Sequence, residues 1–360
     1  MKGLKQTLRH VAEQGSTLSR HDARELLGEI LASTPGEGDL EIAGLLTAFA
    51  TRGETVEELT GFAEAMRVRS LPIPLTEEER AALVDTCGTG GDGLGTFNIS
   101  TGAALVAVAA GAKVAKHGNR AVTSSCGSAD VLEAMGIPVA LGPEQAVECL
   151  RTTGFMFLYA PALHPALKRV QAIRRALGFR TIFNLAGPLT NPAGAPAQVM
   201  GVYSGARVSL VAETMARLGV RRAFVVHGLD GLDELTLCDE SRVAEVRKSG
   251  NREQGTGCSV RLFRVSPEEA GLPRATLAEL RGPDTAEANA TLLNRIFDGD
   301  PGPKRDIVLL NAAAALVAAG VVGGLREGVA RGAEAIDSGA VEGVVGKLRE
   351  FARSVATAAQ

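Results

Sequence analysis

The chain has 360 residues, which is enough for a large buried core and, at typical domain sizes, for two domains. Its formal net charge of -3 excludes a global positive field that would gather nucleic acid or an anionic membrane surface. Glycine supplies 43 residues, aromatic residues make up only 4% and tryptophan is absent, so we expect helices and strands that pack closely through small side chains.

The first part of the chain predicts helices only. Amphipathic patterns run over 4–14, 20–33, 39–53 and 55–70, and Ser19 is placed to cap the second of these helices. Two prolines within 71–75 then predict a linker, because a helix cannot continue through them.

From residue 82 onward, short β-branched runs alternate with helical patterns. This alternation predicts an α/β domain of right-handed βαβ units, in which helices flank a mostly parallel central sheet. We expect strands at 83–88, 112–118, 137–141, 155–161, 199–204 and 223–228, and helices after Ser100, after Ser128, over 144–154 and over 206–218. Residues 235–266 predict an antiparallel excursion, and four helices finish the chain. We therefore divide the chain into a small helical domain at 1–75 and an α/β domain at 76–360.

Two further patterns bear on where the protein works. The five cysteines form no C-x-x-C pair and have no histidine at zinc-ligand spacing, and no charged-then-apolar leader opens the sequence. We therefore expect a cytoplasmic protein with reduced thiols. The apolar run at 307–325 is mostly Ala and Gly around Asn311, so it predicts a buried core helix rather than a membrane span.

Two strand ends carry loops suited to phosphate. Five glycines lie within 88–95, after the first strand, where open α/β sheets bind ligands and where bare backbone N–H groups can approach an anion. Ser100 follows and is expected to cap the next helix, whose positive end then faces the same cleft. The next strand ends in a loop that contains Lys116, Arg120 and several hydroxyls, with Ser128 as a second cap.

Two such loops suit a ligand that carries two separate phosphate groups. The glycine pattern matches neither the P-loop nor the dinucleotide fingerprint, so ATP and NAD are not favoured.

At this point the motifs resemble those of the anthranilate phosphoribosyltransferases, which join anthranilate to phosphoribosyl pyrophosphate in tryptophan biosynthesis. The resemblance is carried by GTGGD at 88–92, NIST at 98–101, KHGNRA at 116–121, GSADVLEAMG at 127–136, the stretch 164–193, GLDEL at 231–235 and LLNAAAAL at 309–316. It implies magnesium-dependent catalysis and a cytoplasmic homodimer formed mainly through the small domains. It also implies that part of 165–195 joins the helical domain.

The resemblance assigns most of both loops to phosphoribosyl pyrophosphate. The implied residues are Gly88, Gly91, Asp92, Thr96, Asn98, Ile99, Ser100, Thr101, Lys116, His117, Gly118, Asn119, Arg120, Ala121, Val122, Thr123, Ser124 and Ser128. We favour the Ser100 helix end and Lys116 for the pyrophosphate, and the loop of the 120s for the ribose and 5′-phosphate. Many family members have Ser-Ser-Lys-Ser where this chain has 123–126 as Thr-Ser-Ser-Cys, so one cation near the phosphate is missing.

The resemblance also assigns a metal site and an acceptor site. Asp233 and Glu234, with the Ser100 hydroxyl, would hold Mg²⁺, for which carboxylate and hydroxyl oxygens are suitable ligands. Gly88, Asn119, His164 and Arg174 would hold anthranilate, with Arg174 as the cation for its carboxylate and His117 lining its approach. Solvated carboxylates, a surface arginine and structural histidines are the competing interpretations of these residues.

Three other functions remain open. A pyrimidine nucleoside phosphorylase shares the fold, but it has a lysine-histidine-serine arrangement where this chain reads KHGN at 116–119. A nucleic-acid-binding relative would show a basic groove and eroded motifs. A phosphoribosyltransferase for another aromatic amine is the third. We expect neither nucleic acid nor a membrane as a partner.

Overall fold

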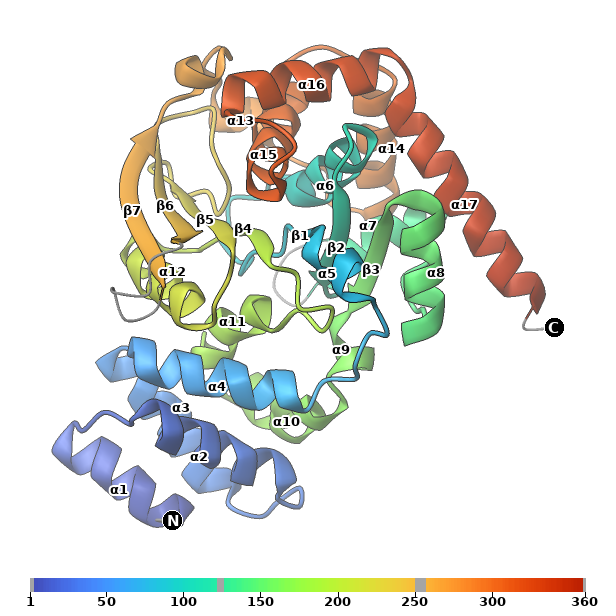
Figure 1. Cartoon of the computed structure of the whole chain (residues 1–360). Helices are drawn as coiled ribbons and strands as arrows, with labels where there is room; N and C mark the ends of the chain where they lie inside the picture. The colour runs from blue at the N-terminus through green and yellow to red at the C-terminus, as the bar shows by residue number, and fades with distance from the viewer. Residues whose placement is uncertain (1–2, 122–125, 250–256, 359–360) are drawn as a thin grey trace.

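The computed structural model describes residues 3–121, 126–249 and 257–358. Its first part is a helical bundle of α1 (Leu4–Gln14), α2 (Arg20–Ala32), α3 (Asp39–Arg52) and α4 (Val56–Val68), as predicted (Figure 1). The Ser19 hydroxyl accepts a hydrogen bond from the Asp22 N–H at 3.1 Å, which confirms it as the cap of α2. A linker without helix or strand covers 71–76, and the short helix α5 (Glu77–Ala81) follows it.

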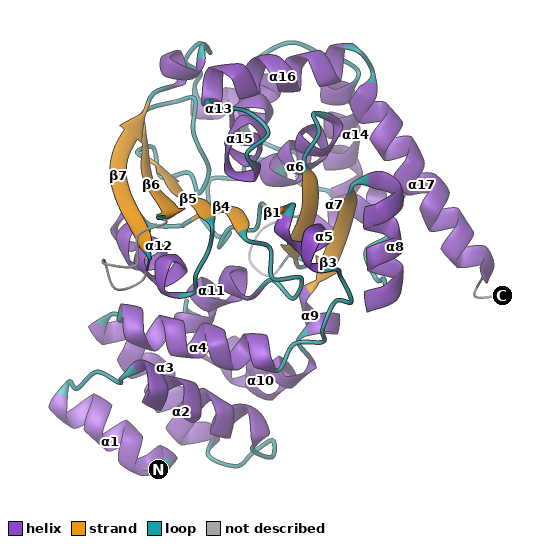
Figure 2. Cartoon of the chain, viewed as in Figure 1, coloured by secondary structure: helices purple, strands orange, loops and turns teal. Residues whose placement is uncertain are grey.

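The rest of the chain is built on one seven-stranded sheet in the order β3-β2-β1-β4-β5-β6-β7 (Figure 2). Its strands are β1 (Leu83–Asp85), β2 (Lys113–Gly118), β3 (Phe155–Tyr159), β4 (Ala197–Gly201), β5 (Arg222–Gly228), β6 (Ser241–Lys248) and β7 (Cys258–Val265). The first five strands are parallel, while β6 and β7 pair antiparallel. The α/β class and the antiparallel excursion are thus confirmed.

The strand predicted at 137–141 is wrong. Ile137, Val139 and Leu141 are each buried, so the alternation in the sequence is real, but the segment pairs with no strand among the described residues. Pro138, which has no N–H to donate to a ladder, lies in its middle. The alternation reflects an irregular segment that packs on the core.

Helices cover both faces of the sheet. The longer ones are α6 (Ile99–Ala109), α7 (Ser128–Ala134), α8 (Pro143–Thr153), α12 (Val208–Arg217), α14 (Ala286–Phe297), α15 (Pro303–Ala319), α16 (Leu325–Asp337) and α17 (Ala340–Ala358). The four predicted C-terminal helices are present, preceded by the short α13 (Leu277–Leu280). The buried run is α15, and it ends at Gly320 in a left-handed cap. No helix of the described chain is long and apolar enough to cross a membrane.

Two hydrophobic cores organise the molecule. One lies around α6, α15 and strands β1–β3. The other joins the bundle helices α2–α4 to α12 and to one face of β4–β6. Three helices come from the chain's middle: α9 (Ala160–Leu163) and α11 (Ile182–Ala186) lie between the sheet and the bundle, and α10 (Lys168–Leu177) packs beside α2 and α3 (Figure 1). Val170 and Phe183 of α10 and α11 belong to the second core, although the exact domain boundary stays a prediction.

Candidate active site

The loop after β1, which we call the glycine loop (88–95), depends on glycine for two separate reasons. Gly90, Gly91, Gly93 and Gly95 adopt positive φ angles between 63° and 80°, which other residues rarely adopt. A Cβ on Gly88 would lie 2.9 Å from the Gly201 carbonyl oxygen. The loop therefore combines left-handed turns with a close approach to the end of β4.

The end of β4 also touches the loop that carries the acidic pair. A Cβ on Gly201 would lie 1.5 Å from the Asp233 carbonyl oxygen, so no other residue fits there. Gly88, Gly201 and Asp233 thus bring three chain segments together backbone against backbone. Gly201 was not singled out in the sequence because the contact joins segments far apart in the chain.

Lys116 forms the floor beneath these loops. Its side chain is 2% exposed, and Nζ donates to the Thr86 carbonyl and hydroxyl oxygens at 3.1 Å each and to Ser100 Oγ at 3.3 Å. Burial lowers the pKa of Lys116, while the charges of Asp85 and Glu234 oppose that shift. The amino group of Lys116 is therefore directed at the start of α6.

Ser100 lies in the first turn of α6 and does not cap it. The helix begins at Ile99, with Asn98 at the N-cap position and no side-chain cap, so the predicted Ser100 cap is wrong. The physical reason is that the Ser100 hydroxyl is occupied by Lys116 and by Glu234, whose pKa this hydrogen bond lowers. The hydroxyl is nevertheless next to the acidic pair, as a shared metal site requires.

Three carboxylates crowd together at this point. The Asp233 N–H donates to Asp92 Oδ2 at 3.4 Å. Burial and then repulsion from Glu234 and Asp92 raise the pKa of Asp233 well above its usual value. Burial also raises the pKa of Glu234 to about 7, although Lys116 lowers it. Negative charge here is under-compensated by the protein, which fits a site for a hard cation.

A buried amide fixes the acidic loop from below. Asn311 of α15 is 3% exposed, accepts from the Leu235 N–H and donates to the Leu235 carbonyl, both at 3.0 Å. Leu235 directly follows Glu234. The sequence offers one signal for this role, the single amide of Asn311 inside an otherwise apolar helix.

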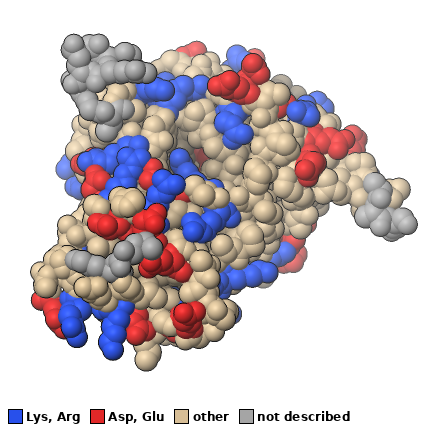
Figure 3. All heavy atoms as spheres, turned by 60° about the horizontal axis from the view of Figure 1, so that its bottom comes forward, with Lys and Arg blue, Asp and Glu red and all other residues tan. Residues whose placement is uncertain are grey.

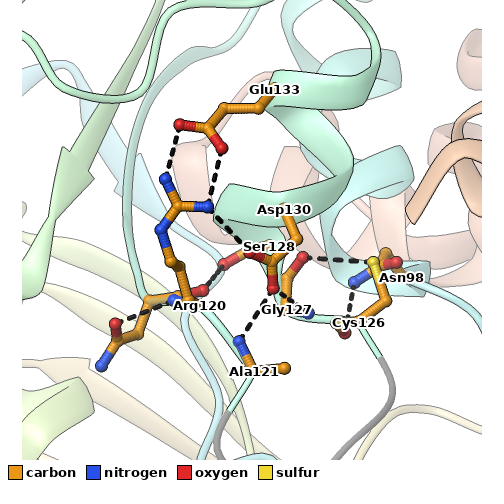
Figure 4. Close-up of polar contacts among 9 residues, drawn as sticks. Asn98, Arg120, Ala121, Cys126, Gly127, Ser128, Asp130 and Glu133 are labelled. Atoms are coloured by element: carbon orange, nitrogen blue, oxygen red, sulfur yellow. Dashed lines mark hydrogen bonds and ion pairs between the residues drawn. The ribbon is translucent and has the colours of Figure 1, made fainter. Parts of the chain in front are cut away.

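The second loop is organised by Asp130 (Figure 4). Asp130 Oδ2 accepts from the N–H groups of Ala121 and Gly127, both at 2.9 Å. Helix α7 begins at Ser128 itself, with Gly127 at the N-cap position, so the predicted Ser128 cap is wrong. Gly127 approaches the backbone at 120–121 too closely to carry a Cβ, and the Ser128 hydroxyl instead donates to the Asn119 carbonyl at 3.3 Å.

Arg120 is held on the outer side of this loop. Its guanidinium pairs with Asp130 at 3.0 Å and with Glu133 at 2.6 Å, and these contacts raise its pKa (Figure 4). Its charge is already paired, in contrast to that of Lys116. The predicted contacts of Val122, Thr123 and Ser124 lie outside the described residues.

The remaining predicted loop residues surround the same region. The Asn98 Nδ2 donates to the Cys126 carbonyl at 3.2 Å, which ties the two loops together. Thr96 forms an isolated β-bridge with Arg281, and a Cβ on Gly118 would collide with Ser128 Oγ at 2.5 Å. Asn119 is exposed. Ile99 and Thr101 are buried at 1% exposure, and their N–H groups donate to the carbonyls of Phe97 at 2.7 Å and Asn98 at 3.2 Å.

The two histidines lie under the site as a pair of neutral rings. The ring centres of His117 and His164 are 5.2 Å apart, and the two side chains are only 4% and 3% exposed. Burial lowers the pKa of His117 to about 3, with a further contribution from His164, and burial lowers the pKa of His164 to about 4. At neutral pH neither ring is a proton donor of the imidazolium type.

Arg174 is a cation without a carboxylate partner among the described residues. It lies on α10, as predicted, with its guanidinium 5.2 Å from the ring centre of Phe183. Burial lowers its pKa. A partly buried arginine whose only described partner is an aromatic ring is suited to receive an anion from solution.

Asp85, at the end of β1, was missed by sequence reasoning. It is fully buried and accepts from the N–H groups of His117 at 3.1 Å and Cys87 at 3.0 Å and from the Asn191 amide at 2.8 Å. Burial raises its pKa to about 6, against the effect of Asn191 and Lys116. A charged residue inside an apolar strand pattern was the available signal. Asp85 connects the starts of both loops.

Comparison with known proteins places this architecture in a family. Residues 5–70 match the helical bundle domain of a glycosyl transferase family, and residues 80–342 match the a/b domain of the same family. An anthranilate phosphoribosyltransferase of Symbiobacterium thermophilum is 48% identical over 348 residues, covering 97% of each chain. That of Solibacter usitatus is 48% identical over 354 residues, covering 98% of this chain and all of the relative.

Solved structures agree. The Thermus thermophilus anthranilate phosphoribosyltransferase superimposes with a TM-score of 0.86 at 41% identity, covering 98% of this chain and 100% of the other. The Saccharomyces cerevisiae enzyme, in complex with PRPP and Mg, gives a TM-score of 0.85 at 26% identity, with 98% of each chain covered. This chain belongs to the anthranilate phosphoribosyltransferase family.

Proposed function

We propose that this protein transfers the phosphoribosyl group of phosphoribosyl pyrophosphate to the amine of anthranilate, with release of pyrophosphate, as a step of tryptophan biosynthesis. One observation supports this most. The glycine loop, the Lys116–Ser100 pair and the carboxylates of Asp233 and Glu234 meet at one edge of the sheet. Phosphate-binding backbone, a buried cation and a cation-binding acidic pair are the groups that this donor requires.

The donor residues follow from these positions. We assign the pyrophosphate to Lys116 and to the N-terminal end of α6, where the positive end of the helix dipole favours an anion. The glycine loop and Asn98 would hold the body of the substrate, and the loop organised by Asp130 would hold the ribose and 5′-phosphate. Arg120 would act through the shape of that loop, because its charge is paired with Asp130 and Glu133.

Mg²⁺ fits the acidic pair. Burial raises the pKa values of Asp233 and Glu234, and repulsion from Glu234 adds to the shift of Asp233. A bound divalent cation would offset this repulsion, and the Ser100 hydroxyl would add a neutral oxygen ligand. When bound there, the ion supplies charge neutralisation at the departing pyrophosphate. The yeast relative with PRPP and Mg bound supports this proposal.

The acceptor needs positioning rather than a strong base. The aromatic amine of anthranilate is weakly basic and largely unprotonated at neutral pH, so its lone pair is free to attack C1 while the bond from C1 to pyrophosphate breaks. The nitrogen, positively charged after the attack, is strongly acidic and releases one proton to water. Arg174 would bind the carboxylate, and Asn119 with Gly88 would orient the ring. His117 and His164 would shape the floor as neutral rings, since their pKa values are lowered by burial.

The first experiment follows anthranilate fluorescence in the presence of phosphoribosyl pyrophosphate and Mg²⁺, with EDTA and no-enzyme controls. We expect magnesium-dependent loss of anthranilate and a product of the adduct's mass. Phosphorolysis of thymidine or uridine without consumption of anthranilate would instead support a nucleoside phosphorylase. Consumption of another aromatic amine alone would move the proposal to a different acceptor.

We further propose that the protein is a cytoplasmic homodimer that associates through the helical bundle, and that the helical domain includes α10 and α11. Leu40 at the start of α3 is 85% exposed, which is unusual for a large apolar side chain and supports a contact there. On the face in Figure 3 basic and acidic side chains are interspersed. Light scattering of the purified protein, compared with that of Leu40→Glu, tests the association.

A further inference from the structure

One side chain links the α10–α11 connection to the glycine loop. A guanidinium nitrogen of Arg180 donates a hydrogen bond to the Gly91 carbonyl oxygen. The same guanidinium lies 4.4 Å from the ring centre of Tyr203. No carboxylate pairs with Arg180 in the part of the chain that the structure describes, so the carbonyl and the ring hold it.

Tyr203 is itself tied to the glycine loop from its other side. Its backbone N–H donates to Thr89 Oγ1 at 3.0 Å, and the Thr89 N–H donates to the Gly201 carbonyl at 2.9 Å. The loop is thus fixed at two points, Thr89 and Gly91, and both fixing contacts lead to Tyr203. A loop rich in left-handed glycines has many alternative conformations, so such anchors decide which one it keeps.

The anchor continues into the helical bundle. Arg207 lowers the pKa of Tyr203 by its charge and by a hydrogen bond, against the larger effect of burial. Arg207 also pairs with Glu54 at 2.9 Å. Glu54 lies in the turn between α3 and α4 and is buried. Contacts therefore run from the bundle through Arg207 and Tyr203 to Arg180 and the glycine loop.

We propose that Arg180 is a positioning residue for phosphoribosyl pyrophosphate, which sets the glycine loop by holding the Gly91 carbonyl with Tyr203 as its support. This inference rests on the proposed function. The held carbonyl immediately precedes Asp92, whose carboxylate accepts the Asp233 N–H at 3.4 Å. Arg180 thus acts on the donor side of the reaction, whereas Arg174 of the same segment is assigned to the acceptor.

The two arginines should therefore have opposite kinetic signatures. Loss of one hydrogen bond that pre-organises the loop should raise the KM for phosphoribosyl pyrophosphate in Arg180→Ala by roughly 3- to 10-fold. The KM for anthranilate at saturating donor should stay at the wild-type value. Arg180→Lys keeps a charged donor but loses the planar stack on Tyr203, so it should recover only part of the loss.

Arg175 supplies the matched control. It is exposed on α10 and makes no polar contact among the described residues. Arg175→Ala should leave both KM values unchanged, and the thermal unfolding of Arg175→Ala and Arg180→Ala should match that of wild type. Tyr203→Leu removes the stacking face while its backbone bond to Thr89 remains. The Arg180→Ala/Tyr203→Leu double variant should be no weaker than the more affected single variant, because both act through one contact.

Calorimetric titration with phosphoribosyl pyrophosphate and Mg²⁺ adds a readout that needs no turnover. The same loss of affinity in Arg180→Ala is expected there. If the wild-type protein binds phosphoribosyl pyrophosphate but does not consume anthranilate, the proposed acceptor is wrong. The effect of Arg180→Ala on donor affinity can still be measured in that case. Donor affinity of Arg180→Ala equal to that of Arg175→Ala, or a raised anthranilate KM in its place, would overturn the inference.

Discussion

Asn311 of α15 hydrogen-bonds both backbone groups of Leu235, the residue directly after the acidic pair. Its Oδ1 accepts from the Leu235 N–H and its Nδ2 donates to the Leu235 and Ile307 carbonyls, all at 3.0 Å. The side chain is buried in an otherwise apolar helix. The core helix therefore determines where Asp233 and Glu234 point.

Replacing the Asn311 amide should lower the stability of the protein and also raise the Mg²⁺ concentration that its activity requires. Asn311→Leu leaves two buried backbone groups of Leu235 unpaired, which should lower the free energy of unfolding by about 1–3 kcal/mol. Because the acidic loop loses its anchor, the Mg²⁺ concentration needed for half-maximal activity should rise. Urea unfolding and magnesium titrations of the initial rate measure the two effects.

Asn289 of α14 is the control for burial. It is 1% exposed and donates to the carbonyls of Pro283 and Thr285, away from the acidic pair. Asn289→Leu should lower stability without changing the magnesium requirement. Equal magnesium requirements in the two variants would show that Asn311 acts on stability alone.

The acidic pair itself should decide the metal dependence. Asp233→Asn with Glu234→Gln removes two anionic ligands and relieves their mutual repulsion, so the folded protein should remain stable while its activity no longer responds to millimolar Mg²⁺. Asp239 and Glu240 form a second adjacent pair, engaged instead with Arg274 and Arg264. Asp239→Asn with Glu240→Gln should keep wild-type metal dependence; the same dependence in the first double variant would remove that pair as ligands.

Arg174 should affect only the acceptor. A charge-assisted contact contributes about 1.5–3 kcal/mol, so Arg174→Ala should lower kcat/KM for anthranilate on the order of 10- to 150-fold. Donor affinity, measured by calorimetry, should not change. Arg175→Ala, the exposed neighbour on the same helix, controls for the loss of a positive charge. An unaltered specificity constant for anthranilate would rule out the assigned role.

The predictions that the structure confirms are those that depend only on residues close together in the sequence. Ser19 was identified as a cap because its hydroxyl precedes an amphipathic run, and its bond to Asp22 depends on nothing distant. The Ser100 and Ser128 caps failed because hydroxyls near a helix start have competing partners, here Lys116 and the Asn119 carbonyl. Most helices and strands were predictable, with the strand at 137–141 as an exception, while the exact first residue of a helix depended on tertiary contacts.

Site residues outside recognisable motifs were not predictable for a related reason. Asn311 and Leu235 are separated by 76 residues, and Arg180 and Gly91 by 89. No periodicity in either segment encodes such a pairing. Asp85 shows the same limit, since its partner Asn191 lies 106 residues away. Sequence patterns place residues on strand ends, but packing decides which side chains meet.

The buried histidines predict how stability depends on pH. His164 has a pKa lowered to about 4 by burial, whereas an unfolded histidine titrates near 6.5. Between these pH values the unfolded chain binds a proton that the folded chain does not. The contribution of His164 to folding stability is therefore fully present above about pH 6.5 and is lost as the pH falls toward 4. Asp85, whose pKa is raised to about 6, contributes with the opposite sign.

A His164→Asn variant removes this titration together with the effect of His164 on the pKa of His117, while the contribution of Asp85 is common to both proteins and cancels in their difference. Lowering the pH from 7.5 to 5.0 should cost wild type about 2 kcal/mol more stability than it costs the variant. Urea unfolding at both pH values measures this, with substitution of the exposed His21 of α2, His21→Asn, as the control for the substitution itself. A difference between wild type and variant that stays constant with pH would mean that His164 has the same pKa in the folded protein as in the unfolded chain, which would contradict its burial as a neutral ring.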